Sequence, residues 1–223
     1  GSMMLLPQFL QSLMGYSAFD SGLAIMPRGC GAMTGVILYG ILANKVDERV
    51  SVAFGLFLIG IAGIFFGFLN LDIATINIGL PNYIYGFGMT LAMIPIIALS
   101  VVTLKNSQMT NATGIQNMLK NIGGAVGTSV ATTLVSRFSQ IHQAYMVDHL
   151  NPLNPVYIER LTSTAGALAQ YTQYNVAQYM AEYSLYGSMV KQASLWGFME
   201  AFRICGILAL VIIPLILLLK KIK

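Results

Sequence analysis

Charged side chains inside long apolar stretches are the residues of this chain whose type and position most suggest chemistry. Arg28 and Lys120 each lie about two helical turns inside such a stretch. A charge inside a bilayer is costly and therefore indicates a functional site. We expect both side chains to face the interior of a helix bundle. The alternative is that each extends to the nearby lipid headgroups.

Further polar residues accompany these two charges. Glu200 and Arg203 are three residues apart, so they can pair on one helix face, and extension to headgroups is an equally good interpretation. Uncharged amides lie near the N-terminus and beside Lys120. The candidates for lining a substrate cavity are therefore Gln8, Gln11, Arg28, Gln116, Asn117, Lys120, Asn121, Glu200 and Arg203.

Motifs of known catalytic sites are absent from the sequence. It contains no G-x-S-x-G, no H-E-x-x-H and no Walker A lysine, and we therefore expect neither an enzyme nor ATP-driven transport. Cys30 and Cys205 lack metal-ligand spacing, and His142 and His149 are seven apart without further ligands. We expect no catalytic residue and no metal site.

Five apolar stretches hold most of these residues, and each can cross a bilayer as a helix, which takes roughly 20 apolar residues. They are 22–43, 51–69, 75–104, 114–138 and 196–219. Residues 1–13 resemble the last turns of a sixth span whose beginning is missing. Hydrophobic residues make up 56% of the chain and charged residues 9%, against about 25% charged in soluble domains. The sequence predicts a single all-α integral membrane domain.

The basic residues predict an orientation. The loop 44–50 carries Lys45 and Arg49, the loop 105–113 begins with Lys105, and three lysines end the chain. The positive-inside rule places these three segments in the cytoplasm and 139–195 outside. Because the basic residues are scattered among helix ends, the net charge of +4 does not indicate a nucleic-acid partner.

The predicted outer loop 139–195 has its own pattern. Two Asn-Pro steps, at 151–152 and 154–155, favour turns, and a helix is predicted near 156–170. Five tyrosines follow at spacings that allow one helix face, at positions 171, 174, 179, 183 and 186. They indicate either a helix resting at the membrane interface or a docking surface for a periplasmic partner.

Three small-xxx-small patterns predict a tightly packed bundle, because glycines let helix backbones approach closely in lipid. They are Gly31/Gly35, Gly63/Gly67 and Gly123/Gly127.

The loop sequence GILANKVDER at 40–49 resembles the G-x-L-x-D-R-x-G-R-R loop of the major facilitator superfamily, in the version of EmrB/QacA-type drug:proton antiporters. Gly40, Leu42, Lys45, Asp47 and Arg49 carry the match, and Asn44 stands where many members have an acid. Residues 5–29, 114–137, 149–155 and 199–208 resemble further stretches of that family, with Lys120 where an arginine is common.

The resemblance implies the C-terminal six-helix half of a fourteen-span transporter, with its first helix truncated and inverted repeats at 1–69 and 75–219. Such proteins export hydrophobic drugs in exchange for protons across the bacterial inner membrane. They use the proton gradient and no cofactor. One loop would stabilise one transport conformation over another, and we call it the latch loop; its motif residues are Gly40, Lys45, Asp47 and Arg49. The implied partners are the N-terminal half, a periplasmic adaptor and an outer-membrane channel.

The coupling carboxylates of the family lie mainly in its N-terminal half, so we expect this chain alone not to transport. Two other functions stay open. One is a non-transporting membrane scaffold that binds a partner through 139–195, and the other is a transporter of a specific metabolite, since a fold does not fix the substrate.

Overall fold

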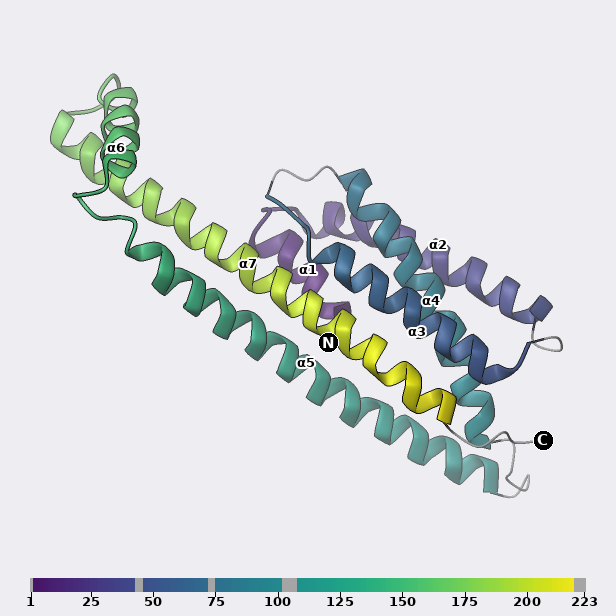
Figure 1. Ribbon diagram of the computed structural model, residues 1–223. Helices are drawn as coiled ribbons and strands as arrows, with labels where there is room; N and C mark the ends of the chain where they lie inside the picture. The colour runs from purple at the N-terminus through teal and green to yellow at the C-terminus, as the bar shows by residue number, and fades with distance from the viewer. Residues whose placement is uncertain (1, 43–45, 72–74, 102–107, 219–223) are drawn as a thin grey trace. The chain divides into compact units, whose positions relative to one another are not determined.

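The computed structural model describes residues 2–42, 46–71, 75–101 and 108–218, and every element in these ranges is an α-helix. The helices are shown in Figure 1 and are α1 (Ser2–Ser12), α2 (Ala18–Leu42), α3 (Glu48–Phe66), α4 (Thr75–Val101), α5 (Met109–Val147), α6 (Pro155–Leu168) and α7 (Tyr174–Leu218). The predicted all-α class is confirmed.

Four of the described helices are long and apolar enough to cross a membrane. The qualifying segments are Ala18–Leu42, Glu48–Phe66, Asn77–Ala98 and Tyr174–Ile216. They match four of the five predicted spans. Helix α5 is long enough, but polar side chains such as Gln116 and Lys120 lower its hydropathy, so a span at 114–138 remains a prediction. The partial span at 1–13 also remains a prediction.

The region predicted as an outer loop, 139–195, is mostly helical. Helix α5 continues to Val147 and α7 begins at Tyr174, so both extend well beyond the predicted span ends. Between them, α6 closely matches the helix predicted near 156–170. An apolar stretch marks where a helix can contact lipid, whereas the helix itself continues through polar residues that favour it equally well.

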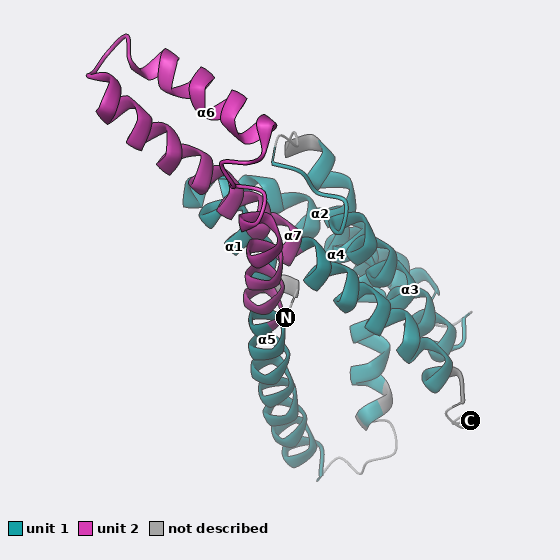
Figure 2. Cartoon of the chain, turned by 60° about the vertical axis from the view of Figure 1, so that its left-hand side comes forward, with its two compact units in different colours: residues 1–133, 199–223 teal, residues 134–198 magenta. Residues whose placement is uncertain are grey.

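The chain divides into two compact units, coloured separately in Figure 2. The first unit comprises residues 1–133 and 199–223, and the second comprises residues 134–198. Each is described by itself.

Local signals start the helices of the first unit. The chain turns after α1 at Gly15, whose φ of 71° is in the left-handed region that glycine adopts without strain. Ser17 then caps α2, because its Oγ accepts a hydrogen bond from the backbone N–H of Asp20 at 3.1 Å. The same hydroxyl donates to the Asp20 carboxylate at 2.7 Å. This reciprocal pair resembles a capping box.

Helix α4 packs against both α2 and α3, and glycines lie at these contacts. A Cβ atom added at Gly31 would collide with the carbonyl oxygen of Tyr83, and one at Gly86 would collide with that of Arg28. Gly55 of α3 faces Gly88 of α4 in the same way. The three helices therefore approach backbone to backbone, as the small-residue patterns predicted.

Helices α3 and α7 also meet at glycines. A Cβ atom at Gly63 would lie 2.8 Å from the Cα atom of Gly206, and the Phe66 and Phe202 rings pack beside them with centroids 5.3 Å apart. Close packing is thus confirmed at the first two glycine patterns. Close packing is not confirmed at the third pattern, Gly123/Gly127, since a Cβ atom at Gly123 would contact nothing within 4 Å.

In the second unit, α6 packs on the first turns of α7. Its core is Leu161, Ala165 and Ala181, with Tyr157, Leu168 and Leu185 packed against it. The end of α5 contacts α7 through a hydrogen bond from Gln143 Nε2 to the Tyr186 hydroxyl, at 2.9 Å. Tyr179 and Tyr183 are 75% and 80% exposed, so the predicted row of tyrosines lies on the surface of this unit.

Candidate functional site

Arg28 of α2 is buried, with 8% of its surface exposed. Its guanidinium donates two hydrogen bonds to Oδ1 of Asn82 in α4, from Nε at 3.2 Å and from Nη2 at 2.9 Å. The Tyr85 ring lies against the same guanidinium, 4.6 Å from its central carbon to the ring centroid. A charge away from water needs such partners, because burying it without them costs several kcal/mol. Arg28 thus faces the interior of its unit, as predicted.

Other polar contacts extend this interface along α2 and α4. The Asn82 amide donates to the carbonyl oxygen of Ala24 at 3.3 Å, which fixes the orientation of its Oδ1 toward Arg28. The Thr34 and Tyr83 hydroxyls are 2.8 Å apart, and Thr90 donates to the carbonyl oxygen of Ala32 at 3.3 Å. The result is a polar seam between two apolar helices, with a fixed positive charge at its centre.

Arg203 interacts with the end of α3. Its Nη2 donates to the carbonyl oxygen of Gly67, the C-terminal cap of that helix, and its guanidinium lies 5.1 Å from the Phe68 ring centroid. A cation is favourable at a helix C-terminus, where the last carbonyl groups carry partial negative charge. Glu200 lies on α7, as Arg203 does, and is half-buried. Its pairing with Arg203 remains a prediction.

The predicted amides near the N-terminus lie at the surface of the first unit. Gln8 and Gln11 are exposed, and Gln11 Nε2 approaches the buried Ser21 hydroxyl at 3.4 Å. This contact links α1 to α2. The structure does not bring these amides to Arg28, so their place in a cavity remains a prediction.

The polar residues of α5 are also at the surface. Asn117, Lys120 and Asn121 are exposed, and Gln116 is half-buried. The expectation that Lys120 faces the interior of a helix bundle therefore stays a prediction. Large apolar side chains of the same helix, including Ile115 and Leu119, are 61% and 62% exposed. The first half of α5 therefore presents both polar and apolar side chains for further contacts.

The predicted latch loop lies between α2 and α3. Gly40 is exposed near the end of α2, and Lys45 is outside the described residues. Asp47 is the N-cap of α3, since its carboxylate accepts from the backbone N–H of Arg49 at 3.4 Å. Within the described residues, Nη2 of Arg49 is buried and has no hydrogen-bond partner. Such an atom is uncommon, because most buried polar groups in proteins have a hydrogen-bond partner.

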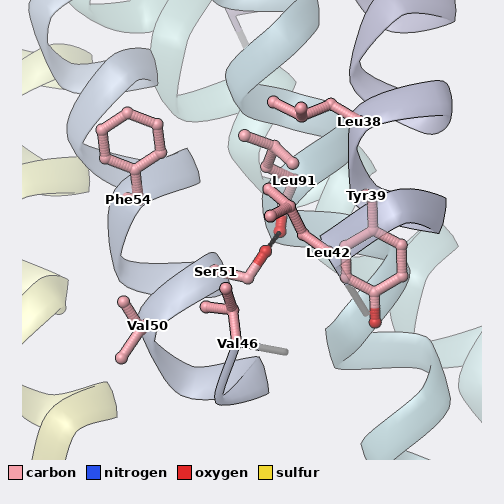
Figure 3. A pocket seen from close by; sticks show the side chains of 8 residues that line it. All are labelled: Leu38, Tyr39, Leu42, Val46, Val50, Ser51, Phe54 and Leu91. Atoms are coloured by element: carbon pink, nitrogen blue, oxygen red, sulfur yellow. Dashed lines mark hydrogen bonds between the residues drawn. The ribbon is translucent and has the colours of Figure 1, made fainter. Parts of the chain in front are cut away.

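A small pocket of about 120 Å³ adjoins this loop and was not predicted. Figure 3 shows its lining from α2, the loop, α3 and α4, which consists of Leu38, Tyr39, Leu42, Val46, Val50, Ser51, Phe54 and Leu91. The Ser51 hydroxyl donates to the carbonyl oxygen of Leu91 at 3.1 Å, so it is already engaged. The pocket suits an apolar group. In the sequence, the apolar pairs Leu38/Leu42 and Val50/Phe54 indicated this pocket, because residues four apart lie on the same helix face.

Comparison with known proteins gives the family. The profile of the Major Facilitator Superfamily matches residues 1–128. The chain is 30% identical over 158 residues to the protein named Probable multidrug resistance protein EmrY of Escherichia coli K12, covering 70% of this chain and 31% of that protein. It is 27% identical over 158 residues to the multidrug export protein EmrB of the same strain, covering 70% and 30%.

A third relative is matched along almost the whole chain. The fatty acid resistance protein FarB of Neisseria gonorrhoeae is 27% identical over 220 residues, which cover 99% of this chain and 42% of FarB. The chain thus spans less than half the length of these curated relatives, which are transport or resistance proteins rather than enzymes. With the apolar helices and the matched profile, these similarities establish that the chain belongs to the major facilitator superfamily.

Proposed function

We propose that this chain forms the C-terminal half of a proton-coupled exporter that moves hydrophobic drugs across the bacterial inner membrane by alternating access. One observation carries the proposal. The chain matches multidrug and fatty acid resistance proteins over 70–99% of its own length but only 30–42% of theirs. A chain of this kind supplies one wall of a central cavity and needs the other half to transport.

The packing of the first unit supports a rigid role in that cycle. In alternating access, one bundle rocks against another as a nearly rigid body. The glycine contacts among α2, α3 and α4 join these helices backbone to backbone, and the Arg28–Asn82 hydrogen bonds connect α2 to α4 within this group. We assign Arg28 the role of holding α2 and α4 in position, since two of its nitrogens donate hydrogen bonds to Asn82.

The exposed residues of α5 are our best candidates for the cavity wall. Lys120 offers a positive charge, and Gln116, Asn117 and Asn121 offer amides on neighbouring turns. Gln8, Gln11, Glu200 and Arg203 are further candidates. A mixed polar and apolar wall of this kind suits drugs that are largely hydrophobic and carry few polar groups.

The latch loop is the second part of the proposed mechanism. Asp47 caps the start of α3, and two residues later Arg49 has a guanidinium nitrogen without a hydrogen-bond partner in the described part of the chain. A contact made by that nitrogen in only one conformation would stabilise that conformation over the other. Gly40 and Lys45 belong to the same loop motif.

The charge pattern gives the proposed orientation, and exposed tyrosines indicate the proposed partners. We place the C-terminus and the loop 44–50 in the cytoplasm and residues 139–195 outside. There, exposed tyrosines such as Tyr179 and Tyr183 can contact a periplasmic adaptor, which would connect to an outer-membrane channel.

Drug accumulation in cells tests the proposal, with the complete gene and with residues 1–223 alone, each with and without a proton-gradient uncoupler. We expect low accumulation only with the complete gene and only without uncoupler. Export that survives the uncoupler would contradict proton coupling. Resistance from residues 1–223 alone would contradict the need for another half.

A further inference from the structure

The second unit contains a cleft of about 400 Å³, where the end of α5, the start of α6 and the middle of α7 meet. This volume lies in the range of drug-sized binding sites, roughly 300–1,000 Å³. The residues that line it all belong to the second unit, so it is separate from the Arg28 seam and from the pocket beside the latch loop.

Part of the lining of the cleft is apolar. Its apolar side chains are Met146, Leu150, Val156, Leu185 and Met189. Methionine side chains are flexible and polarisable, so they adapt to apolar ligands of different shape. These side chains suit a hydrocarbon chain.

The ionisable side chains of the cleft are basic or neutral. Arg160 and His149 line it, and no Asp or Glu does. Both side chains are exposed, and the Arg160 guanidinium makes no hydrogen bond or ion pair within the described part of the chain. A planar guanidinium matches the geometry of a carboxylate and can bind it through two parallel hydrogen bonds. The basic side chains of the cleft therefore suit an anion.

The cleft is built before any ligand binds. The Asn154 side chain caps α6 by accepting from the backbone N–H of Val156 at 3.1 Å, and it donates to the carbonyl oxygen of His149 at 2.9 Å. Tyr157 and Leu185 are packed against the core of the second unit. These lining residues are thus held by contacts that do not involve the Arg160 guanidinium.

We propose that this cleft binds a single-tailed amphiphile with a carboxylate headgroup. Arg160 pairs with the carboxylate, the His149 ring contributes a hydrogen bond, and the tail lies along Leu150, Leu185 and Met189. One guanidinium and one set of apolar side chains fit one headgroup and one chain, whereas a diacyl phospholipid would need room for two chains. Because binding is measured without transport, this site can exist or fail independently of the proposed export function.

The test uses the complete natural protein in phosphatidylcholine nanodiscs and a 12-carbon fatty acid with a photoreactive diazirine at its tail. After irradiation, peptide mass spectrometry locates the adducts. We expect them on residues 146–150 and 185–192, with competition by laurate and none by dodecyltrimethylammonium at the same concentration. Competition by the cation equal to that by laurate, or adducts only elsewhere, would overturn the proposal.

Variants isolate the headgroup contact. Arg160→Gln should reduce labelling about threefold to fivefold, the range expected for an exposed ion pair, and Arg160→Lys should retain most of it. Lys191→Gln is the matched control, because it removes a charge from exposed α7 surface that does not line the cleft. Equal labelling in Arg160→Gln and Lys191→Gln would overturn the carboxylate assignment.

A third variant tests the tail site. Ser188→Phe places a ring into the cleft from an exposed helix position and should block labelling. Unchanged labelling in Ser188→Phe would also count against the cleft. If nanodiscs with added phosphatidylglycerol abolish labelling of the unsubstituted protein, the occupant is an anionic lipid and the proposal is wrong.

Discussion

Nε and Nη2 of Arg28 converge on one acceptor, the Oδ1 atom of Asn82, across the interface of α2 and α4. The two residues are 54 positions apart in the sequence. Asn82 is itself fully buried, and its amide is held by the carbonyl oxygen of Ala24. A single amide side chain therefore compensates much of the cost of a buried charge in the first unit.

Asn82→Ala should destabilise the protein by about 1–3 kcal/mol, because it leaves the buried Arg28 guanidinium without its acceptor. Thermal unfolding of the purified protein in detergent measures this as a lower midpoint. Asn77→Ala is the control, since Asn77 is an exposed amide near the start of the same helix. Equal midpoints for the two variants would show that the hydrogen bonds to Asn82 contribute little.

Gly31→Ala should reduce both expression and thermal stability, because the new methyl group would collide with the carbonyl oxygen of Tyr83. Gly29→Ala is a close match two residues earlier on α2, and its methyl group meets nothing within 4 Å. That change should be neutral or stabilising by up to about 1 kcal/mol, since alanine favours helix. A stable Gly31→Ala variant would mean that α2 and α4 can separate without cost.

Substitutions at Asp47 should separate helix capping from charge. Asp47→Ala removes the cap of α3 and should cost about 0.5–2 kcal/mol of stability, whereas asparagine caps a helix as well as aspartate does. Asp47→Asn should therefore lose less stability than Asp47→Ala does. If drug export by the complete protein nevertheless falls in Asp47→Asn, the negative charge is required for the transport cycle.

Arg49→Ala should impair drug export while leaving stability within about 0.5 kcal/mol, because the buried Nη2 atom has no hydrogen-bond partner to lose in the described part of the chain. Export and thermal unfolding are measured on the complete protein. Arg49→Lys keeps the positive charge and shows whether export needs the planar set of N–H donors of the guanidinium. Unchanged export in Arg49→Ala would argue against the latch.

Lys120→Ala should lower drug resistance without reducing protein levels, since Lys120 is exposed and its removal disturbs no packing in the first unit. Minimal inhibitory concentrations and immunoblots of the membrane fraction give the two readings. Arg137→Ala removes an exposed charge further along α5 and serves as the control. Normal resistance at normal protein level would exclude a cavity role for Lys120.

The sequence predicted the membrane class, four of the crossing helices, the interior position of Arg28 and the close approach at two glycine patterns. These features depend on local pattern, namely apolar length, the depth of a charge and the spacing of small residues. The partner of Arg28 was not predictable in this way. Asn82 is an ordinary amide in an apolar stretch, and only the packing of α4 on α2 brings it to the guanidinium.

The ends of α5 and α7 were missed for a related reason. Hydropathy falls near residues 139 and 195, yet the polar residues there continue the helices, which extend to Val147 and begin at Tyr174. The cleft at Arg160 depends on how α6 folds back onto α7, a tertiary arrangement that periodicity does not encode. The latch-loop pocket was within reach, because its apolar residues recur at helical spacing on adjoining segments.

The exposed polar residues of α5 have a consequence for biogenesis. A lysine at the centre of a membrane-spanning helix opposes insertion by about 2.5–3.5 kcal/mol. If α5 crosses the membrane as predicted, its exposed Asn117, Lys120 and Asn121 make it a poor substrate for the translocon on its own. Stable accumulation in the cell therefore depends on how soon after synthesis other helices cover this face.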